Sequence, residues 1–282
     1  MNPRQMFQVL SQARQTRPTV SVVIPALNEA DNLPYVLPLI PFDEVDEVVL
    51  VDGGSTDGTV EVARALVPDI RVVTQLGRGK GDALQAGFEA SIGDIIVALD
   101  ADGSTDPREI PLFIGALVSG ADYVKGSRFM QGGGTDDMPL LRRAGNWGLT
   151  MLVRALYGGR YTDLCYGYNA FWRWALPALH LDADGFEIET LMNIRALRSG
   201  LRVTEVMSFE APRIHGEGRL QTFPDGFRVL RTILSERIRP QQRVARQLQP
   251  AFATRRPAPV AVIEPVHERT NGIAQVNGVS AR

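Results

Sequence analysis

Short apolar runs that end in polar or glycine-containing loops recur along the first half of the chain, and this alternation limits the fold more than any other feature. The runs occupy residues 20–24, 47–51, 70–74, 95–99 and 123–125, and helix-like stretches follow at 32–39, 58–66, 82–91 and 109–119. Apolar runs of this length, bounded by turn residues, are typical of buried strands. Strands that alternate with helices form parallel sheets with right-handed crossovers. The sequence therefore predicts an α/β fold with a mostly parallel sheet flanked by helices.

The second half lacks this regular alternation. A glycine-rich segment at 132–137 is expected to be a flexible break, and the patterns after it predict helices at 145–156 and 186–199, a strand at 203–209 and a last helix at 223–239. We therefore divide the chain into an N-terminal extension (1–17), one domain (18–240) and a tail (241–282). The tail has no hydrophobic period, so we expect it to be disordered.

The last predicted helix has two interpretations. Large apolar residues recur at helical spacing with arginines between them: the apolar residues are Phe223, Phe227, Leu230, Leu234 and Ile238, and the arginines are Arg228, Arg231, Arg237 and Arg239. Such a stripe most often packs on the core. The alternative is a basic amphipathic helix that lies on a membrane surface.

Two aspartates one residue apart follow the apolar run at 95–99. Side chains i and i+2 of an extended segment point the same way, so Asp100 and Asp102 can face one ligand. Ligands of open α/β sheets bind at the carboxyl ends of strands, and Mg²⁺ sites often combine one or two carboxylates with substrate phosphates. The pair predicts a divalent cation that holds a diphosphate. The alternative is a solvated turn of Asp, Gly, Ser and Thr.

Three further polar loops follow predicted strands. After the first strand, Asn28 and Glu29 can contact a nucleoside or cap the next helix. After the second, Asp52 can accept a hydrogen bond from a base or a ribose hydroxyl. After the third, glycines beside Arg78 and Lys80 precede a helix, where backbone amides and a cation suit a diphosphate. The spacing of this loop is not that of a P-loop nucleotide hydrolase.

In this order and spacing the loops resemble those of the inverting family 2 glycosyltransferases with the GT-A fold, and most closely the dolichyl- or polyprenyl-phosphate hexose synthases. The resemblance covers about residues 20–235. The segments that carry it are 25–29, 51–59, 79–83, 100–102, 126–128, 142–143, 162–164 and 213–220.

The resemblance implies transfer of a hexose, with inversion, from a nucleotide-diphosphate sugar, with Mg²⁺ or Mn²⁺ as cofactor. The resemblance does not distinguish UDP-glucose from GDP-mannose as the donor. By the same resemblance, residues 18–130 form the nucleotide-sugar-binding half, and residues 131–240 form the acceptor half with its C-terminal amphipathic helix. Polyprenyl phosphate is the expected acceptor, and a soluble small molecule is the alternative.

The resemblance and the loop chemistry together give the candidate site residues. The donor-binding candidates are Pro25, Ala26, Asn28, Glu29, Asp52, Lys80, Gly81, Asp100, Ala101 and Arg128. The metal candidates are Asp100 and Asp102, and the catalytic candidates are Asp102, Arg213, Arg219 and Glu189. Arg128, Arg213 and Arg219 would bind the donor diphosphate or an acceptor phosphate, because the guanidinium fork matches phosphate oxygens.

The acceptor decides whether a general base is needed. A phosphate acceptor is already anionic, so catalysis is mainly positioning and stabilisation of the leaving group. A hydroxyl acceptor requires a base. Glu189 is the candidate and Glu187 the competitor, because two positions along a helix the side chains point about 200° apart and only one can face the site.

Three positions depart from the family pattern. Gly53 stands where a second aspartate is usual, Ser104 stands where the lipid-phosphate mannose synthases commonly have a glutamine metal ligand, and Tyr-Gly-Tyr-Asn at 166–169 replaces the usual Ser-Phe-Arg. The last change removes an arginine and adds aromatic residues on the expected acceptor side.

Composition narrows the remaining possibilities. A net charge of −2 provides no basic field for nucleic acid. Cys165 is the single cysteine, which excludes an internal disulfide and fits a reducing compartment. No window approaches the roughly 18 to 20 apolar residues of a membrane span. We expect a cytoplasmic protein, peripheral at most on the inner face of the membrane. The functional alternatives are a nucleotidyltransferase and a catalytically silent nucleotide-sugar-binding subunit.

Overall fold

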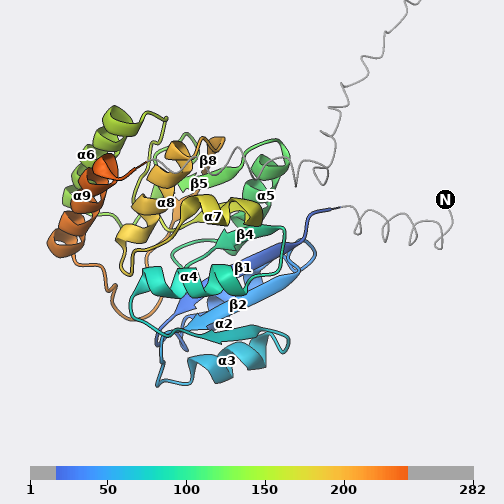
Figure 1. Cartoon of the computed structure of the whole chain (residues 1–282). Coiled ribbons are helices and arrows are strands. Elements are labelled where there is room, and N and C mark those ends of the chain that lie inside the picture. Colours follow the sequence, from blue (N-terminus) through green and yellow to red (C-terminus); the bar gives the residue numbers. More distant parts are fainter. Residues whose placement is uncertain (1–16, 241–282) are drawn as a thin grey trace, which may run out of the picture.

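A computed structural model of the chain describes residues 17–240 (Figure 1), so the predicted extension, apart from Arg17, and the predicted tail lie outside the described residues. A seven-stranded sheet forms its centre, in the order β3-β2-β1-β4-β7-β5-β8. The strands are β1 (Val20–Ala26), β2 (Glu47–Asp52), β3 (Arg71–Thr74), β4 (Ile95–Ala98), β5 (Tyr123–Ser127), β7 (Asn169–Trp172) and β8 (Val203–Met207). Pairing is parallel everywhere except around β7, so the predicted mostly parallel sheet is confirmed.

Strand β7 was not predicted, because four residues without a preceding turn signal give little pattern. It lies between β4 and β5 and runs antiparallel to both, with Ala98 opposite Asn169 and Lys125 opposite the same residue. An antiparallel strand begins at the edge where its parallel neighbours end. The chain just before Asn169 is therefore delivered to the carboxyl edge of the sheet, where Asp100 also lies.

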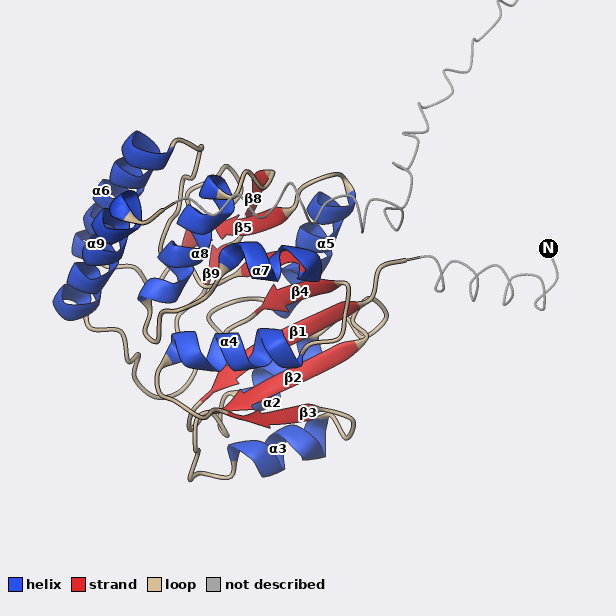
Figure 2. Cartoon of the chain, viewed as in Figure 1, coloured by secondary structure: helices blue, strands red, loops and turns tan. Residues whose placement is uncertain are grey.

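Helices cover both faces of the sheet (Figure 2). One face packs on α2 (Leu33–Val36), α3 (Thr59–Leu66) and α5 (Ile110–Val118). The other face packs on α4 (Lys80–Ala90), α7 (Leu176–Leu179) and α8 (Glu187–Arg198). Short 3₁₀ turns complete the fold at Leu37–Leu39, Pro107–Glu109 and Arg173–Ala175. Apolar strand residues are buried on both faces, as expected for a parallel sheet between two helix layers.

Two long helices form an outer pair at one end of the molecule: α6 (Leu140–Tyr157) and α9 (Thr222–Ile238). They pack on α8 through a small separate cluster that includes Val153, Ile194 and Ile233. They run side by side in the same direction, because Arg142 Nε donates to Thr222 Oγ1 at 3.1 Å near their starts and the Tyr157 hydroxyl donates to the Ile233 carbonyl further along.

The predicted glycine-rich break contains ordered structure. Residues Gly134–Thr135 form β6, which pairs in parallel with β9 (Phe209–Glu210) in a second, two-stranded sheet. The strand predicted at 203–209 is therefore two strands, separated at Ser208, and the helix predicted at 145–156 begins earlier, at Leu140. Among residues 17–240, no helix is both long enough and apolar enough to cross a membrane.

Four of the five residues of the apolar stripe of α9 are exposed and Leu230 is half-buried, so the first interpretation, that the stripe packs on the core, is wrong. Exposed fractions are 76% for Phe223, 69% for Phe227, 50% for Leu234 and 87% for Ile238. The buried side of α9 carries Val229 and Ile233 instead, with Asp225 and Glu236. Buried Glu236 forms ion pairs with Arg195 at 2.8 Å and with Arg198 at 2.9 Å. These ion pairs link α8 to the inner side of α9. The stripe is thereby directed outward.

Candidate active site

The loops singled out in the sequence meet at the carboxyl edge of the sheet. Ala26 and Asp52 are partners at the ends of β1 and β2, and Asp100 lies two residues beyond the end of β4. The Gly53 amide donates to the Ala26 carbonyl at 2.9 Å, which joins two of the loops. This is the edge where open α/β sheets bind ligands.

Lys80, at the first position of α4, lies between two carboxylates. Its Nζ is 2.6 Å from Asp100 Oδ1 and 2.6 Å from Glu189 Oε1. Burial alone would lower the pKa of Lys80, but the two carboxylates raise it overall, so the amine is a cation. Burial, and repulsion from Asp102 and Glu189, raise the pKa of Asp100 to about 6 although Lys80 opposes the shift. We name these three groups the Lys80 cluster. It brings together the loop after β4 and the first turns of α4 and α8.

Gly167 lies directly against the Lys80 cluster. A β-carbon at this position would be 2.7 Å from Asp100 Oδ2 and 2.8 Å from Lys80 Nζ. It would also be 2.9 Å from Glu189 Oε1. Any side chain at residue 167 would therefore displace the cluster. Sequence reasoning missed this residue, because the antiparallel strand that follows it was not predicted.

Asp102 belongs to a second cluster, with Arg213 and Glu29. Arg213 Nη1 lies 3.3 Å from Asp102 Oδ2, and its Nη2 lies 2.6 Å from Glu29 Oε2. Asp102 Oδ1 also accepts hydrogen bonds from the amide and hydroxyl of Ser104, at 3.0 and 2.7 Å. The departure from the family pattern at position 104 thus orients the Asp102 carboxylate.

The segment 211–220 crosses the ends of these loops. The Ile214 amide donates to the Asp102 carbonyl at 3.2 Å. Arg219 Nη2 donates to the Leu27 carbonyl at 2.7 Å. The His215 amide donates to Asn32 Oδ1 at 2.8 Å. We call the loop that contains Asp100 and Asp102 the DxD loop. Arg213 and Arg219 lie far from it in sequence but are held over the predicted donor site.

Amides of the loop after β2 hold both nucleoside candidates. Asn28, which has a left-handed φ of 55°, accepts a hydrogen bond from the Thr56 amide at 2.8 Å. Asp52 accepts from the amides of Gly54 and Ser55, at 3.2 and 3.1 Å. Asp52 is half-buried, so these bonds orient its carboxylate and leave part of it accessible. Pro25 is half-buried next to them, and Ala101 is buried behind the DxD loop.

Gly79 and Gly81, at the start of α4, are needed for close packing. The Gly81 amide donates to the Asp184 carbonyl at 2.7 Å, so the predicted approach of this amide to a diphosphate is wrong for this structure. A β-carbon on Gly81 would lie 2.0 Å from the Ala183 carbonyl oxygen, and one on Gly79 would lie 2.3 Å from the Asp184 carbonyl oxygen. Glycine is required here because the segment 183–184 packs against the loop.

Asp100 and Asp102 are the side chains that could hold a divalent cation. Asp100 and Asp102 are partly exposed, with side-chain exposures of 25% and 24%. No set of three or more His, Cys, Asp or Glu side chains in residues 17–240 is arranged to hold a metal by itself. Two carboxylates that need substrate phosphates to complete the coordination are the usual arrangement for Mg²⁺.

Arg128 occupies a different environment from the one predicted. Its Nε and Nη2 donate to Asp163 at 2.6 and 2.9 Å, and its Nη1 donates to Glu210 at 2.9 Å. Only 4% of the side chain is exposed. All three nitrogens thus contact carboxylates, and the geometry does not offer this arginine to a phosphate. Tyr166, expected near the acceptor, is buried, with its ring 4.6 Å from the Arg128 guanidinium.

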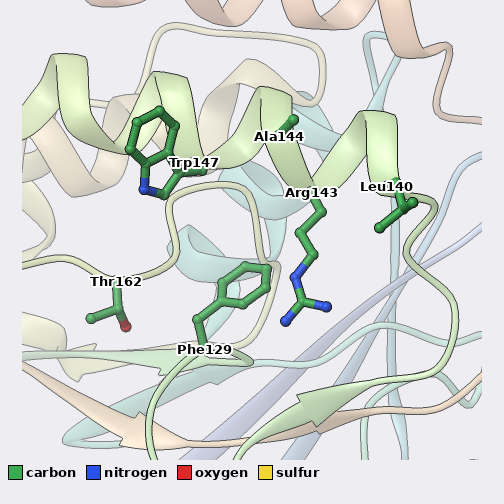
Figure 3. Close-up of a pocket in the computed structure, with 6 residues that line it drawn as sticks. All are labelled: Phe129, Leu140, Arg143, Ala144, Trp147 and Thr162. Atoms are coloured by element: carbon green, nitrogen blue, oxygen red, sulfur yellow. The ribbon is translucent and has the colours of Figure 1, made fainter.

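An open groove lies beside α6, next to this buried ion pair (Figure 3). Its volume is about 490 Å³, and it is lined by Phe129, Leu140, Arg143, Ala144, Trp147 and Thr162. Figure 3 shows the Arg143 side chain extending from α6 toward Phe129, with Trp147 further along the same helix. The Arg143 guanidinium lies 5.2 Å from the centre of the Phe129 ring. We name this feature the α6 groove. It combines apolar walls with one cation. Arg143 and Thr162 belong to segments that carry the family resemblance, but the sequence did not indicate that they line one groove.

Comparison with known proteins agrees with this geometry. The profile of Glycosyl transferase family 2 matches residues 21–176. The chain is 34% identical over 213 residues to an undecaprenyl-phosphate mannosyltransferase of Micrococcus luteus, covering 71% of this chain and 87% of that protein. It is 32% identical over 206 residues to a polyprenol monophosphomannose synthase of Mycolicibacterium smegmatis, covering 68% and 77%.

A solved structure supports the fold as well. Glucosyl-3-phosphoglycerate synthase from Mycobacterium tuberculosis, in complex with Mn²⁺, uridine diphosphate and phosphoglyceric acid, superposes with a TM-score of 0.64 and 29% identity. The match covers 82% of each chain. The predicted GT-A fold is confirmed, and the comparisons favour glycosyl transfer over nucleotidyl transfer.

Proposed function

Because the chain belongs to glycosyl transferase family 2, we propose that this glycosyltransferase moves a hexose, with inversion, from a nucleotide-diphosphate sugar to a polyprenyl phosphate. The observation that carries the proposal is the pairing of a DxD loop at the carboxyl edge of the sheet with an apolar groove that contains a cation. The first feature suits a sugar-nucleotide diphosphate, and the second suits an anionic lipid.

The donor would bind across the two clusters at the sheet edge. Asp52 and Asn28 would contact the nucleoside, and Arg213 and Arg219 would contact the diphosphate. Asp100 and Asp102 would hold Mg²⁺ or Mn²⁺, which when bound stabilises the charge that develops on the departing diphosphate. Asp102, Glu29 and the His215 carbonyl already orient Arg213. Because 17% of this side chain is exposed, against 4% for Arg128, a diphosphate would replace part of these contacts at Arg213. Preorganised charge of this kind typically contributes about 100-fold or more to rate for each group.

The state of Glu189 favours a phosphate acceptor. Its Oε1 already accepts a hydrogen bond from Lys80 at 2.6 Å, so this oxygen is occupied by the amine and does not face an acceptor hydroxyl. Glu187 points elsewhere, since its Oε1 faces the Gly185 amide at 3.4 Å. A phosphate acceptor needs no base. We infer that Glu189 positions Lys80 and, through it, Asp100.

In this proposal the acceptor binds in the α6 groove. Arg143 would bind the phosphate, and Phe129, Leu140 and Trp147 would contact the first isoprene units. In the reaction, an acceptor phosphate oxygen forms a bond to the anomeric carbon as the bond from that carbon to the donor diphosphate breaks. The nucleoside diphosphate leaves with the electron pair, and no proton needs to move.

A soluble phosphorylated acceptor is the second candidate. It is favoured by the similarity to a synthase whose structure contains phosphoglyceric acid. Phosphoglyceric acid carries a free hydroxyl as well as a phosphate, and transfer to that hydroxyl would require a general base. The two candidates therefore differ in whether a proton must move.

The first experiment is calorimetry of UDP-glucose and GDP-mannose binding with and without Mn²⁺. We expect metal-dependent binding of one donor, and its loss in Asp102→Ala but not in the control Asp69→Ala, which changes an exposed aspartate outside the site. With that donor, undecaprenyl phosphate in detergent and 3-phosphoglycerate are compared as acceptors. Failure of both donors in the presence of metal would contradict the proposal, and nucleoside triphosphates would then be tested.

A further inference from the structure

The outer pair of helices exposes an unusual combination of side chains. On α6, Leu140 is 82% exposed and Trp147 is 66% exposed, and Leu141 is exposed as well. On α9, the stripe of Phe223, Phe227, Leu234 and Ile238 is exposed, as described above. Large apolar patches that face solvent usually mark a binding surface. We name these residues of both helices the outer face.

The two halves of the outer face lie together. The Arg142–Thr222 hydrogen bond joins the first turns of α6 and α9, so Leu140 and Leu141 lie at the same end of the pair as Phe223. Leu140 and Trp147 also line the α6 groove. The outer face and the mouth of the groove are therefore continuous.

The charge on the outer pair has one sign. Five arginines of the two helices are exposed: Arg143, Arg154, Arg228, Arg231 and Arg237. Of these, Arg228 pairs with Asp225 at 3.3 Å. Helix α6 contains no acidic residue at all. The two acidic residues of α9, Asp225 and Glu236, are buried on its inner side. At 100° per residue, Arg237 and Arg231 lie about 60° to either side of the centre of the α9 stripe. The stripe is thus bordered by cations, as in helices that lie in a lipid interface.

We infer that the outer face is a docking surface for an anionic lipid bilayer, and that docking brings the α6 groove to the membrane. The inference rests on the proposed function in one respect: a lipid-linked acceptor has to be reached at a membrane. An exposed apolar stripe would enter the acyl boundary, and the flanking arginines would meet anionic headgroups.

Charge decides against two other occupants of the outer face. The segment 241–282, which follows α9, carries six arginines and two glutamates, so it would be repelled by the exposed arginines. A second copy of the same face would bring like charges together across a two-fold axis. An anionic bilayer is the occupant whose charge complements this face.

Vesicle co-sedimentation of the full chain tests the inference without any nucleotide or sugar. We expect binding to vesicles of phosphatidylcholine with 30% phosphatidylglycerol, little binding to pure phosphatidylcholine, and release in 0.5 M salt. The double variant Arg231→Glu and Arg237→Glu should weaken binding by roughly 25-fold or more, since each arginine near an anionic surface contributes about fivefold. Phe223→Ser with Phe227→Ser should weaken it by roughly tenfold or more.

Matched controls lie at the other end of the molecule. Arg64→Glu on α3 and Ile92→Ser before β4 change an exposed arginine and an exposed apolar residue, and both should bind vesicles as the wild type does. Calorimetry of donor binding on the same variants checks folding and tests the proposed function separately.

Three results would overturn the inference. One is folded wild-type protein that does not sediment with the anionic vesicles. Another is equal loss of binding in the α9 variants and in the controls. The third is a dimer in light scattering that dissociates in the Phe223→Ser, Phe227→Ser variant, which would assign the outer face to a second copy.

Discussion

Gly167→Ala is the most informative single change, because it adds one methyl group to the Lys80 cluster and nothing else. The new β-carbon would be 2.7 Å from Asp100 Oδ2, where ordinary contact begins at 3.4 Å. The carboxylate must therefore retreat by about 0.7 Å, the difference of these two distances. A displacement of about 1 Å in a catalytic array can cost about 100-fold in rate. We expect transfer to slow by roughly 30- to 100-fold.

The same substitution should leave the protein folded. Overpacking costs about 1–3 kcal/mol, and replacing glycine by alanine returns about 0.4–1 kcal/mol through the unfolded chain. The net loss in the free energy of unfolding is then at most about 2.6 kcal/mol. Chemical denaturation measures this quantity, and the initial rate of nucleoside diphosphate release measures transfer.

The matched control is Gly115→Ala in α5, where a β-carbon would meet nothing within 4 Å. It should keep the wild-type rate and gain up to about 1 kcal/mol in stability. A folded Gly167→Ala protein with wild-type rate would refute the reasoning, since the position of the Lys80 cluster would then not matter for transfer.

Three further predictions concern Arg128, Asp100 and Cys165. Arg128→Ala leaves Asp163 without its main cationic partner and should lower the free energy of unfolding by about 3–5 kcal/mol; a loss below about 1 kcal/mol in denaturation would contradict the structural role of this arginine. Metal-dependent donor binding requires ionised Asp100, whose pKa burial raises to about 6, so affinity should fall as pH drops below about 6 and approach tenfold per unit; a flat calorimetric profile from pH 7.5 to 5 would exclude this aspartate as the controlling group. Burial also raises the pKa of Cys165 from 9.0 to about 12, so the native thiol should react with a disulfide reagent roughly a thousandfold more slowly than the unfolded chain, and comparable rates would show that the thiol is accessible.

The fold could be predicted where local pattern decides it. The apolar runs that became β1, β2 and β4 are short, buried on both faces and bounded by turns, so their period and ends carry the needed information. Asp100 was placed at the carboxyl edge of the sheet by the same logic. Strand β7 could not be placed, because its position between β4 and β5 depends on pairing with residues more than 40 positions away.

The candidate site was predictable as a set of loops but not as a set of partners. Lys80 and Glu189 are 109 residues apart, and no local pattern indicates that they meet. Arg128 has the chemistry of a phosphate ligand, yet Asp163 and Glu210 satisfy it in the fold. The spacing of apolar residues in α9 correctly indicated a helix with one apolar side. It could not indicate whether that side faces the protein or solvent, because the spacing is the same in both cases.

The sheet order also has a consequence for synthesis on the ribosome. Strand β5 ends at residue 127, and its two partners, β7 and β8, end at residues 172 and 207. At 5–20 residues per second, the first partner is complete only about 2–9 s after β5 has been made. Until then β5 has no neighbour in the nascent chain, whereas β1, β2, β3 and β4 can pair as they emerge. The nascent protein therefore passes through a stage in which four of the seven strands can pair and β5, whose residues are buried in the folded protein, has no partner. This stage is the one that chaperones would have to protect.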